Sequence, residues 1–217
     1  MSRLLFTKEG PAVYASHLDL MRTMRRALLR AGLPVKHSEG FNPHANITIA
    51  VPLPLGHSSC CELMDFTLQD PSAAVDAVER LNAALPTGVR ALEFYEGERA
   101  FKHIEYIRYH MELIYDNAAE LDIAGLENIF AQKEIVIYKK SKKTEGDFDI
   151  APCIKEIHFE KAGDNKVICQ PVLTAARPML NPQYLIAAVK KYLPEMTPDH
   201  TRYSRLEVYD AQMQVFR

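Results

Sequence analysis

The apolar positions in the first half of the chain alternate between a strand-like and a helix-like period. Short apolar or alternating runs predict strands at residues 2–8, 45–51, 60–68 and 89–96. Two stretches with apolar residues three and four positions apart predict helices, one after Ser16 and one that begins at Pro71. The resulting order is β-α-β-β-α-β, which is the order of a ferredoxin-like fold.

Capping residues and apolar stripes define the two expected helices. Ser16 and Asp19 form a capping box, in which the serine hydroxyl accepts from the Asp19 amide, and Gly32 and Pro34 end that helix. The stripe expected to be buried in the first helix consists of Leu18, Met21, Met24, Leu28 and Ala31. The stripe expected in the second helix consists of Ala74, Val75, Val78, Leu81 and Leu85.

The second half repeats this order with one extra strand. Residues 106–115 alternate apolar and polar side chains, as a half-buried strand does. Helices are expected at residues 118–131 and 182–193, and the remaining strands at 134–140, 153–161, 166–174 and 205–209. We therefore expect an α+β protein made of two tandem ferredoxin-like (βαββαβ) units with antiparallel sheets, at residues 1–98 and 104–217.

Composition agrees with a globular protein and limits its setting. The 217 residues are 47% hydrophobic and 25% charged, with a net charge of -2. No apolar run approaches the roughly 20 residues of a membrane-spanning helix, and Lys8 and Glu9 interrupt the N-terminal apolar run, so neither a membrane span nor a secretory signal is expected. We expect a cytoplasmic protein with its four cysteines reduced.

The near-zero net charge conceals a basic first helix. Residues 1–36 contain seven Lys or Arg and two acids. Four arginines lie within a sector of about 140° of the first helix, because successive residues turn by about 100°. They are Arg22, Arg25, Arg26 and Arg30. Such a face either binds phosphate or nucleic acid, for which the guanidinium fork is suited, or is a solvated face paired with acids from elsewhere.

The loop from Lys36 to Asn46 is the second candidate, because it is longer than most helix-to-strand connections. Lys36, Asn42 and His44 are expected to contact substrate there. Phe41 either stacks on a base or fills the core, and the core is the favoured interpretation. His37 and His44 are either a general acid and base for RNA cleavage or, as we favour, hydrogen-bonding groups.

Three other groups of residues are weaker candidates. The basic run with Lys139, Lys140, Lys142 and Lys143 is either a second phosphate-binding segment or a solvated face. Asp147 and Asp149 could orient a substrate amine or a magnesium ion, but a loop held in place by these acids is favoured. His57, Cys60 and Cys61, even with His44, are not expected to bind a metal, because neighbouring cysteines in a strand point to opposite faces. No signature of a nucleophilic cysteine surrounds either residue.

Several of these segments resemble the radical SAM-linked protein family, a domain of unknown function found free-standing or fused behind a radical SAM enzyme. The similar segments are Ser16–Arg22, Arg25–Leu28, Ala31–Pro34, Ser38–His44 and Pro52–Gly56. The resemblance covers residues 3–66 most closely and implies a radical SAM protein as partner, but no established activity. The later segment Asp149–Pro152 departs from the family, because Ala151 stands where arginine is usual.

Three functions follow from the sequence. The leading hypothesis is an accessory module without a cofactor of its own, which binds RNA or another phosphate-bearing substrate for a radical SAM enzyme on a separate chain. The second is a metal-independent endoribonuclease that uses His17, His37 or His44, as the fold-level similarity to CRISPR RNA-processing nucleases with two ferredoxin-like domains suggests. The third is a protein-interaction scaffold without affinity for RNA.

Overall fold

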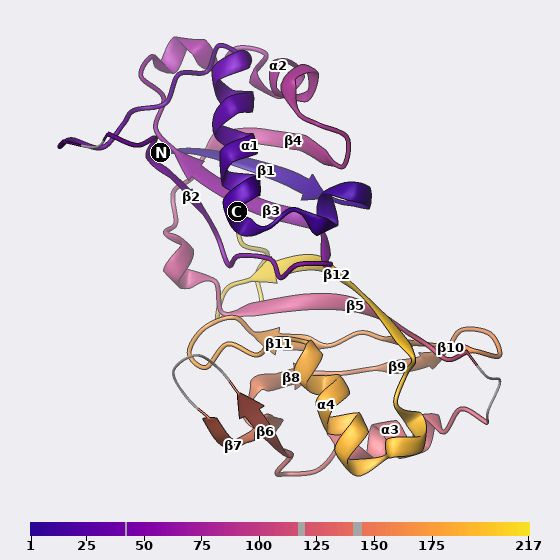
Figure 1. The fold of residues 1–217 in the computed structure, drawn as a ribbon. Coiled ribbons are helices and arrows are strands. Elements are labelled where there is room, and N and C mark those ends of the chain that lie inside the picture. Colours follow the sequence, from indigo (N-terminus) through magenta and orange to yellow (C-terminus); the bar gives the residue numbers. More distant parts are fainter. Residues whose placement is uncertain (42, 117–119, 141–144) are drawn as a thin grey trace. The chain divides into compact units, whose positions relative to one another are not determined.

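The computed structural model describes residues 1–41, 43–116, 120–140 and 145–217 (Figure 1). The chain divides into two compact units, one of residues 1–103 with Arg217 and one of residues 104–216. The described residues form a mixed α+β protein with four α-helices and strands that pair antiparallel. None of these helices has the length and apolarity needed to span a membrane.

The first unit is a four-stranded sheet with two helices. Its strands lie in the order β4-β1-β3-β2, with β1 antiparallel to both of its neighbours. In chain order the elements are β1 (Ser2–Lys8), α1 (His17–Arg30), β2 (Ile47–Ile49), β3 (Ser58–Phe66), α2 (Ala77–Ala84) and β4 (Val89–Glu96). All four predicted strands are therefore present, and β1 and β4 have the predicted bounds.

Helix α1 begins where the capping box predicts. The Ser16 hydroxyl accepts a hydrogen bond from the Asp19 backbone N–H at 3.2 Å and donates one to the Asp19 carboxylate at 2.7 Å. The predicted buried stripe is wrong at its first position, because Leu18 is exposed and Leu20 is buried in its place. Leu20 is four residues before Met24 and eight before Leu28, so it shares their face of the helix.

Helix α2 begins six residues later than predicted. Pro71 starts a short 3-10 turn, Pro71–Ala74, which the Asp70 side chain caps by accepting from the Ser72 N–H. The backbone of Asp76 then adopts a left-handed conformation, with φ 54°, and α2 starts at Ala77. The periodic apolar pattern of residues 74–85 therefore spans a turn, and Val75 is exposed.

One hydrophobic core fills the space between the helices and the sheet of this unit. Leu4 and Phe6 of β1 pack with Met64 and Phe66 of β3, and α1 contributes Met24. Alternate residues of β1 point to the opposite face, where Arg3 is fully buried and paired with Asp65 of β3.

The second unit is also built around one long central strand. Strand β5 lies between β12 on one side and β10 and β11 on the other; β9 pairs with β10, and β8 pairs with β11. In chain order the elements are β5 (Tyr106–Ile114), α3 (Ile123–Phe130), β6 (Val136–Lys140), β7 (Glu145–Asp149), β8 (Ile154–Glu156), β9 (Phe159–Lys161), β10 (Lys166–Cys169), β11 (Val172–Thr174), α4 (Gln183–Tyr192) and β12 (His200–Tyr209).

The second unit departs from the prediction in several places. Strand β6 forms a separate two-stranded sheet with β7, so Asp147 and Asp149 lie in a strand and the expectation of a loop there is wrong. Each of the predicted strands 153–161 and 166–174 is two short strands. Helix α3 begins at Ile123, because the Asp122 side chain accepts from the Gly125 N–H and caps it there. The start of the predicted helix at residues 118–119 lies outside the described residues.

Candidate functional site

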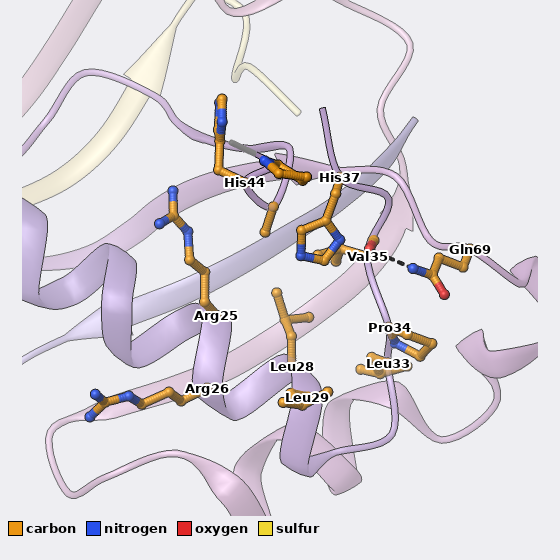
Figure 2. Close-up of a pocket in the computed structure, with 12 residues that line it drawn as sticks. Arg25, Arg26, Leu28, Leu29, Leu33, Pro34, Val35, His37, His44 and Gln69 are labelled. Atoms are coloured by element: carbon orange, nitrogen blue, oxygen red, sulfur yellow. Dashed lines mark hydrogen bonds between the residues drawn. The ribbon is translucent and has the colours of Figure 1, made fainter. Parts of the chain in front are cut away.

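An open groove of about 580 Å³ lies between the second half of α1 and the chain that follows it (Figure 2). Arginines and histidines from the two predicted candidate segments meet in this groove, above a largely apolar floor. The lining residues are Arg25, Arg26, Leu28, Leu29, Leu33, Pro34, Val35, His37, Pro43, His44, Ala45 and Gln69.

One side of the groove is fixed by the way α1 ends. The backbone of Gly32 takes a left-handed conformation, with φ 65°, which glycine adopts at little cost and which turns the chain off the helix. The guanidinium of Arg80, from α2, donates to the carbonyl oxygens of Ala31 and Gly32, each at 2.8 Å. The segment that leaves α1 therefore follows a defined path into the groove wall.

The other side is the long loop, whose two arms form a hairpin that is held on the end of β3. The Lys36 N–H donates to the Thr67 carbonyl at 2.8 Å, and the Asn46 N–H donates to the Lys36 carbonyl at 2.9 Å. A β-bridge between His37 and Ala45 joins the two arms. These bonds bring His37 and His44 to the groove from opposite arms.

The two arginines of the groove come from adjacent positions of α1. Figure 2 shows Arg25 extending toward the side that carries His37 and His44, whereas Arg26 extends away from them. Arg25 is half-buried, and its Nε is shielded from solvent without a hydrogen-bond partner in the described chain. Among the described residues, no ion pair forms to Arg25 or Arg26, and none of the lining residues is acidic. The groove is therefore cationic, with two guanidiniums that the described carboxylates leave unmatched.

The remaining two arginines of the predicted basic face point elsewhere. Arg22 pairs with Asp19 at 3.0 Å, one turn earlier on the exposed surface of α1. The hydrogen bond from the Ser16 hydroxyl, followed by the hydrogen bond and charge of Arg22, lowers the pKa of Asp19. Arg30 donates to the carbonyl oxygen of Ala84 at 2.6 Å, at the C-terminus of α2. The structure therefore divides the predicted four-arginine face into a groove pair and two residues with partners in the protein.

Other predicted contact residues lie near the groove but do not line it. Lys36 is exposed, and Phe41 is fully exposed at the tip of the hairpin, so the interpretation of Phe41 as a core residue is wrong. With a relative exposure of 112%, the aromatic ring is in solvent. Asn42 lies outside the described residues. His17 opens α1, about 12 Å along the helix axis from Arg25 at 1.5 Å per residue, and does not line the groove with His37 and His44.

The second basic run lies in the other unit and is partly outside the described residues. The ammonium of Lys139 lies over the ring of Phe148 at 4.4 Å and over that of Tyr184 at 5.2 Å, so this side chain packs on its own unit. The side chain of Lys140, and both Lys142 and Lys143, are not described. Asp149 accepts from the N–H groups of Ile135 and Ala151 and fixes the base of the β6–β7 hairpin.

The residues considered for a metal are separated by the pleat of β3. Cys60 is exposed, whereas Cys61 and His57 are buried. Within the described part of the chain, no group of three His, Cys, Asp or Glu side chains has the arrangement of a metal site.

Gln69 and Leu29 are among the groove residues that sequence reasoning did not identify. Gln69 donates from Nε2 to the Val35 carbonyl at 3.2 Å and lies far from α1 in sequence, so no local signal points to it. Leu29 is 72% exposed. Its position, one residue after the buried Leu28, places it off the core stripe, and this periodicity is the signal that could have identified it.

The sequence matches one family over most of its length. Residues 2–182 match the family described as "Uncharacterized protein conserved in bacteria (DUF2344)". The search of curated proteins found no match.

Two solved structures align with this chain at low sequence identity. A chain of a Cbf5-Nop10-Gar1 complex superposes with a TM-score of 0.53 and 10% identity, over 95% of this chain and 48% of that chain. A chain of an H/ACA RNP bound to a substrate RNA containing 2'-deoxyuridine gives a TM-score of 0.49 and 9% identity, over 94% and 46%. This protein thus spans about half the length of either chain, and the first likeness concerns the fold alone.

Proposed function

This chain belongs to the family of uncharacterised conserved bacterial proteins DUF2344, and we propose that it is a binding module for RNA or another phosphate-bearing substrate. The groove between α1 and the hairpin 36–46 is the proposed binding site. Arg25 and Arg26 supply the positive charge, and His37 and His44 supply hydrogen-bonding groups from the two arms of the hairpin.

The observation that carries the proposal is the charge balance of the groove. Two arginines and two histidines line it together with apolar residues and one glutamine, and no lining residue is acidic. Arg25 and Arg26 bring two positive charges without a described counter-charge to the groove, and a phosphate neutralises such charges by accepting bidentate hydrogen bonds from a guanidinium. The ring N–H groups of the two histidines add hydrogen-bond donors for the same anion.

Two further features favour RNA among phosphate-bearing ligands. The floor of the groove is apolar, through Leu28, Leu33 and Val35, and suits the face of a base. Phe41 stands fully exposed at the hairpin tip, where it can stack on a second base.

The proposal includes a fold assignment and a partner. The order β4-β1-β3-β2 in the first unit, and β12 and β10 on either side of β5 in the second, support two tandem ferredoxin-like units, with the β6–β7 hairpin as an insertion. The resemblance of residues 3–66 to the radical SAM-linked family supports a radical SAM enzyme on a separate chain as the partner that receives the substrate.

Filter binding of single-stranded RNA at two salt concentrations tests the proposal. We expect affinity to fall as salt rises, and the Arg25→Ala, Arg26→Ala double variant to bind weakly with a salt slope smaller by about 1.4, which is the loss of two single-strand phosphate contacts. Arg22→Ala is the matched control, because Arg22 lies on the same helix but pairs with Asp19. RNA affinity that is independent of salt and of both groove arginines would exclude this site.

Incubation of the same RNA in EDTA distinguishes binding from cleavage. The binding module leaves the RNA intact. Cleavage that is lost in both His37→Ala and His44→Ala would instead identify a metal-independent endoribonuclease, since these two histidines line the groove together. Copurification with a radical SAM protein without any RNA affinity would identify a scaffold.

A further inference from the structure

We infer that the groove holds a single unstacked nucleotide of the RNA, with the base on its apolar floor and the 5'-phosphate at Arg25 and the hairpin. This inference rests on the proposed function and goes further, because it assigns a place to the base as well as to the phosphate. It is carried by the size of the groove, by its apolar surface and by the positions of its polar groups.

The size of the groove suits one nucleotide. Its volume of about 580 Å³ lies within the range of roughly 300–1,000 Å³ that is usual for small-ligand pockets. The nucleotides on either side of the bound one therefore lie outside the groove. Phe41 at the hairpin tip offers a stacking surface for a neighbouring base outside the groove.

Part of the apolar lining of the groove is not buried in the core of the first unit. Leu28, Leu33 and Val35 are buried at its base. Leu29 lines the groove and is 72% exposed. Its aliphatic side chain is therefore available to contact a ligand. Exposed aliphatic surface beside two arginines matches a ligand that has both a flat apolar face and a phosphate.

The polar groups lie where a nucleotide needs them. Figure 2 shows Arg25 extending toward the hairpin that carries His44, whereas Gln69 lies near Val35 on the other side of His37. Gln69 uses one N–H for the Val35 carbonyl, so its amide retains a second N–H donor and its carbonyl acceptor. A side-chain amide with both functions can hydrogen-bond the edge of a base.

NMR titration with small probes tests the inference. The intact protein is titrated with inorganic phosphate, with ribose 5-phosphate and with the four ribonucleoside 5'-monophosphates, and shifts of the Gln69 amide and the His44 ring report binding into the millimolar range. We expect at least one nucleotide to bind about tenfold more tightly than ribose 5-phosphate, which is the gain expected from one buried base.

Variants separate the base from the phosphate. Leu29→Ala should remove most of the preference for the nucleotide and leave ribose 5-phosphate binding as it was; the exposed position and the helix-favouring alanine keep the fold intact. Arg25→Ala should weaken both ligands, and Arg22→Ala should change neither. Gln69→Ala should reduce discrimination among the four nucleotides.

Equal affinity for nucleotides and ribose 5-phosphate would overturn the inference, as would an absence of nucleotide binding. If RNA still binds through Arg25 and Arg26 in either case, the proposed function stands and only the nucleotide site is wrong. If RNA binding does not depend on these arginines, both proposals fail.

Discussion

The hydroxyl of Ser38 lies 2.9 Å from Nδ1 of His44. The same hydroxyl accepts a hydrogen bond from the backbone N–H of His44 at 3.2 Å. The Ser38 N–H in turn donates to the His44 carbonyl at 2.9 Å. One serine therefore joins the two arms of the hairpin and holds the ring of a histidine that lines the groove.

Ser38→Ala should remove the side-chain hydrogen bonds between Ser38 and His44 and leave the rest of the first unit folded. Each lost hydrogen bond contributes about 1 kcal/mol net, and the site is at the surface, so the free energy of unfolding should fall by about that amount. RNA affinity should fall several-fold, because His44 is no longer held in place. Urea unfolding and filter binding measure the two effects.

Ser72→Ala provides the control for this change. The Ser72 hydroxyl also bonds a surface partner, the carboxylate of Asp70 at 2.8 Å, but it lies in the 3-10 turn before α2 and does not line the groove. Its loss should leave RNA binding at the wild-type level. Equal losses of RNA affinity in the two serine variants would show that hairpin order does not matter.

The buried pair Arg3–Asp65 should dominate the stability of the first sheet. Two hydrogen bonds of 2.7 and 2.8 Å join the guanidinium to the carboxylate across β1 and β3, and the guanidinium carbon lies 4.6 Å from the centroid of the Phe101 ring. Burial opposes the charge of Arg3, but the hydrogen bonds and charge of Asp65 outweigh it and raise the pKa of Arg3. Asp65→Asn leaves a buried cation without its counter-charge and should destabilise the protein by about 3–5 kcal/mol.

The exposed pair between Arg202 and Glu112 is the comparison for Asp65→Asn. Its atoms lie 3.4 Å apart and the Arg202 side chain is 76% exposed, so Arg202→Ala should cost about 0–1 kcal/mol. Urea unfolding of both variants gives the difference. If Asp65→Asn lowered the free energy of unfolding as little as Arg202→Ala, other groups would have to compensate the charge of Arg3.

The parts of the fold that the sequence predicted are those with strong local signals. Ser16 and Asp19 fix the start of α1 through bonds within one turn, and the alternation of β5 leaves Tyr109, Met111 and Leu113 buried. The prediction is wrong where the backbone conformation of one residue interrupts an otherwise periodic apolar pattern. The left-handed Asp76 splits the second helical stretch, and nothing in an apolar count reveals it.

The candidate site was predicted in part for the same reason. Helical spacing placed four arginines together, but the direction of each long side chain depends on tertiary partners. Arg30 reaches the carbonyl of Ala84, 54 residues away, and Gln69 reaches the groove through Val35. Such contacts are set by how α1, α2 and β3 pack, which the spacing of charges along one helix does not encode.

Alkaline pH should destabilise the second unit through Tyr115. Burial, followed by the nearby Cys169 and Asp199, raises the pKa of Tyr115 to about 12, against an ordinary value of about 10. Below pH 10 the phenol is neutral in both states and has no effect on pH dependence. Between about pH 10 and 12 the unfolded chain loses this proton while the folded chain keeps it, so stability falls as the pH rises.

Tyr115→Phe separates this effect from the other buried groups. The Tyr115 hydroxyl donates to the Met196 carbonyl at 3.1 Å, so the variant should lose about 1 kcal/mol at neutral pH but decline less steeply above pH 10. Cys169, whose pKa burial also raises, is retained in both proteins. Urea unfolding at several pH values gives the slopes. Tyr14→Phe, at an exposed position, should keep the wild-type slope, and an unchanged slope in Tyr115→Phe would refute the assignment.

Arg80 does not line the groove, but it should hold the chain segment that forms one groove wall. Its guanidinium donates to four backbone carbonyls, those of Ala31, Gly32, Ala73 and Val75, at 2.8 to 3.1 Å, and so joins the end of α1 to the turn before α2. Arg80→Ala leaves these carbonyls without their donor and should cost about 1–3 kcal/mol. Amide exchange at residues 31–36 should accelerate in this variant, and RNA affinity should fall although Arg80 does not line the groove.

Arg80→Lys tests whether geometry or charge matters at this position. An ammonium keeps the charge but offers only three donors from one point, so it cannot reach carbonyls on both sides of the planar fork. The lysine variant should therefore resemble Arg80→Ala in exchange at residues 31–36. If lysine restored wild-type protection, a positive charge near the C-terminus of α1 would be sufficient. The path of the groove wall would then depend on the helix dipole, and the four hydrogen bonds would be dispensable.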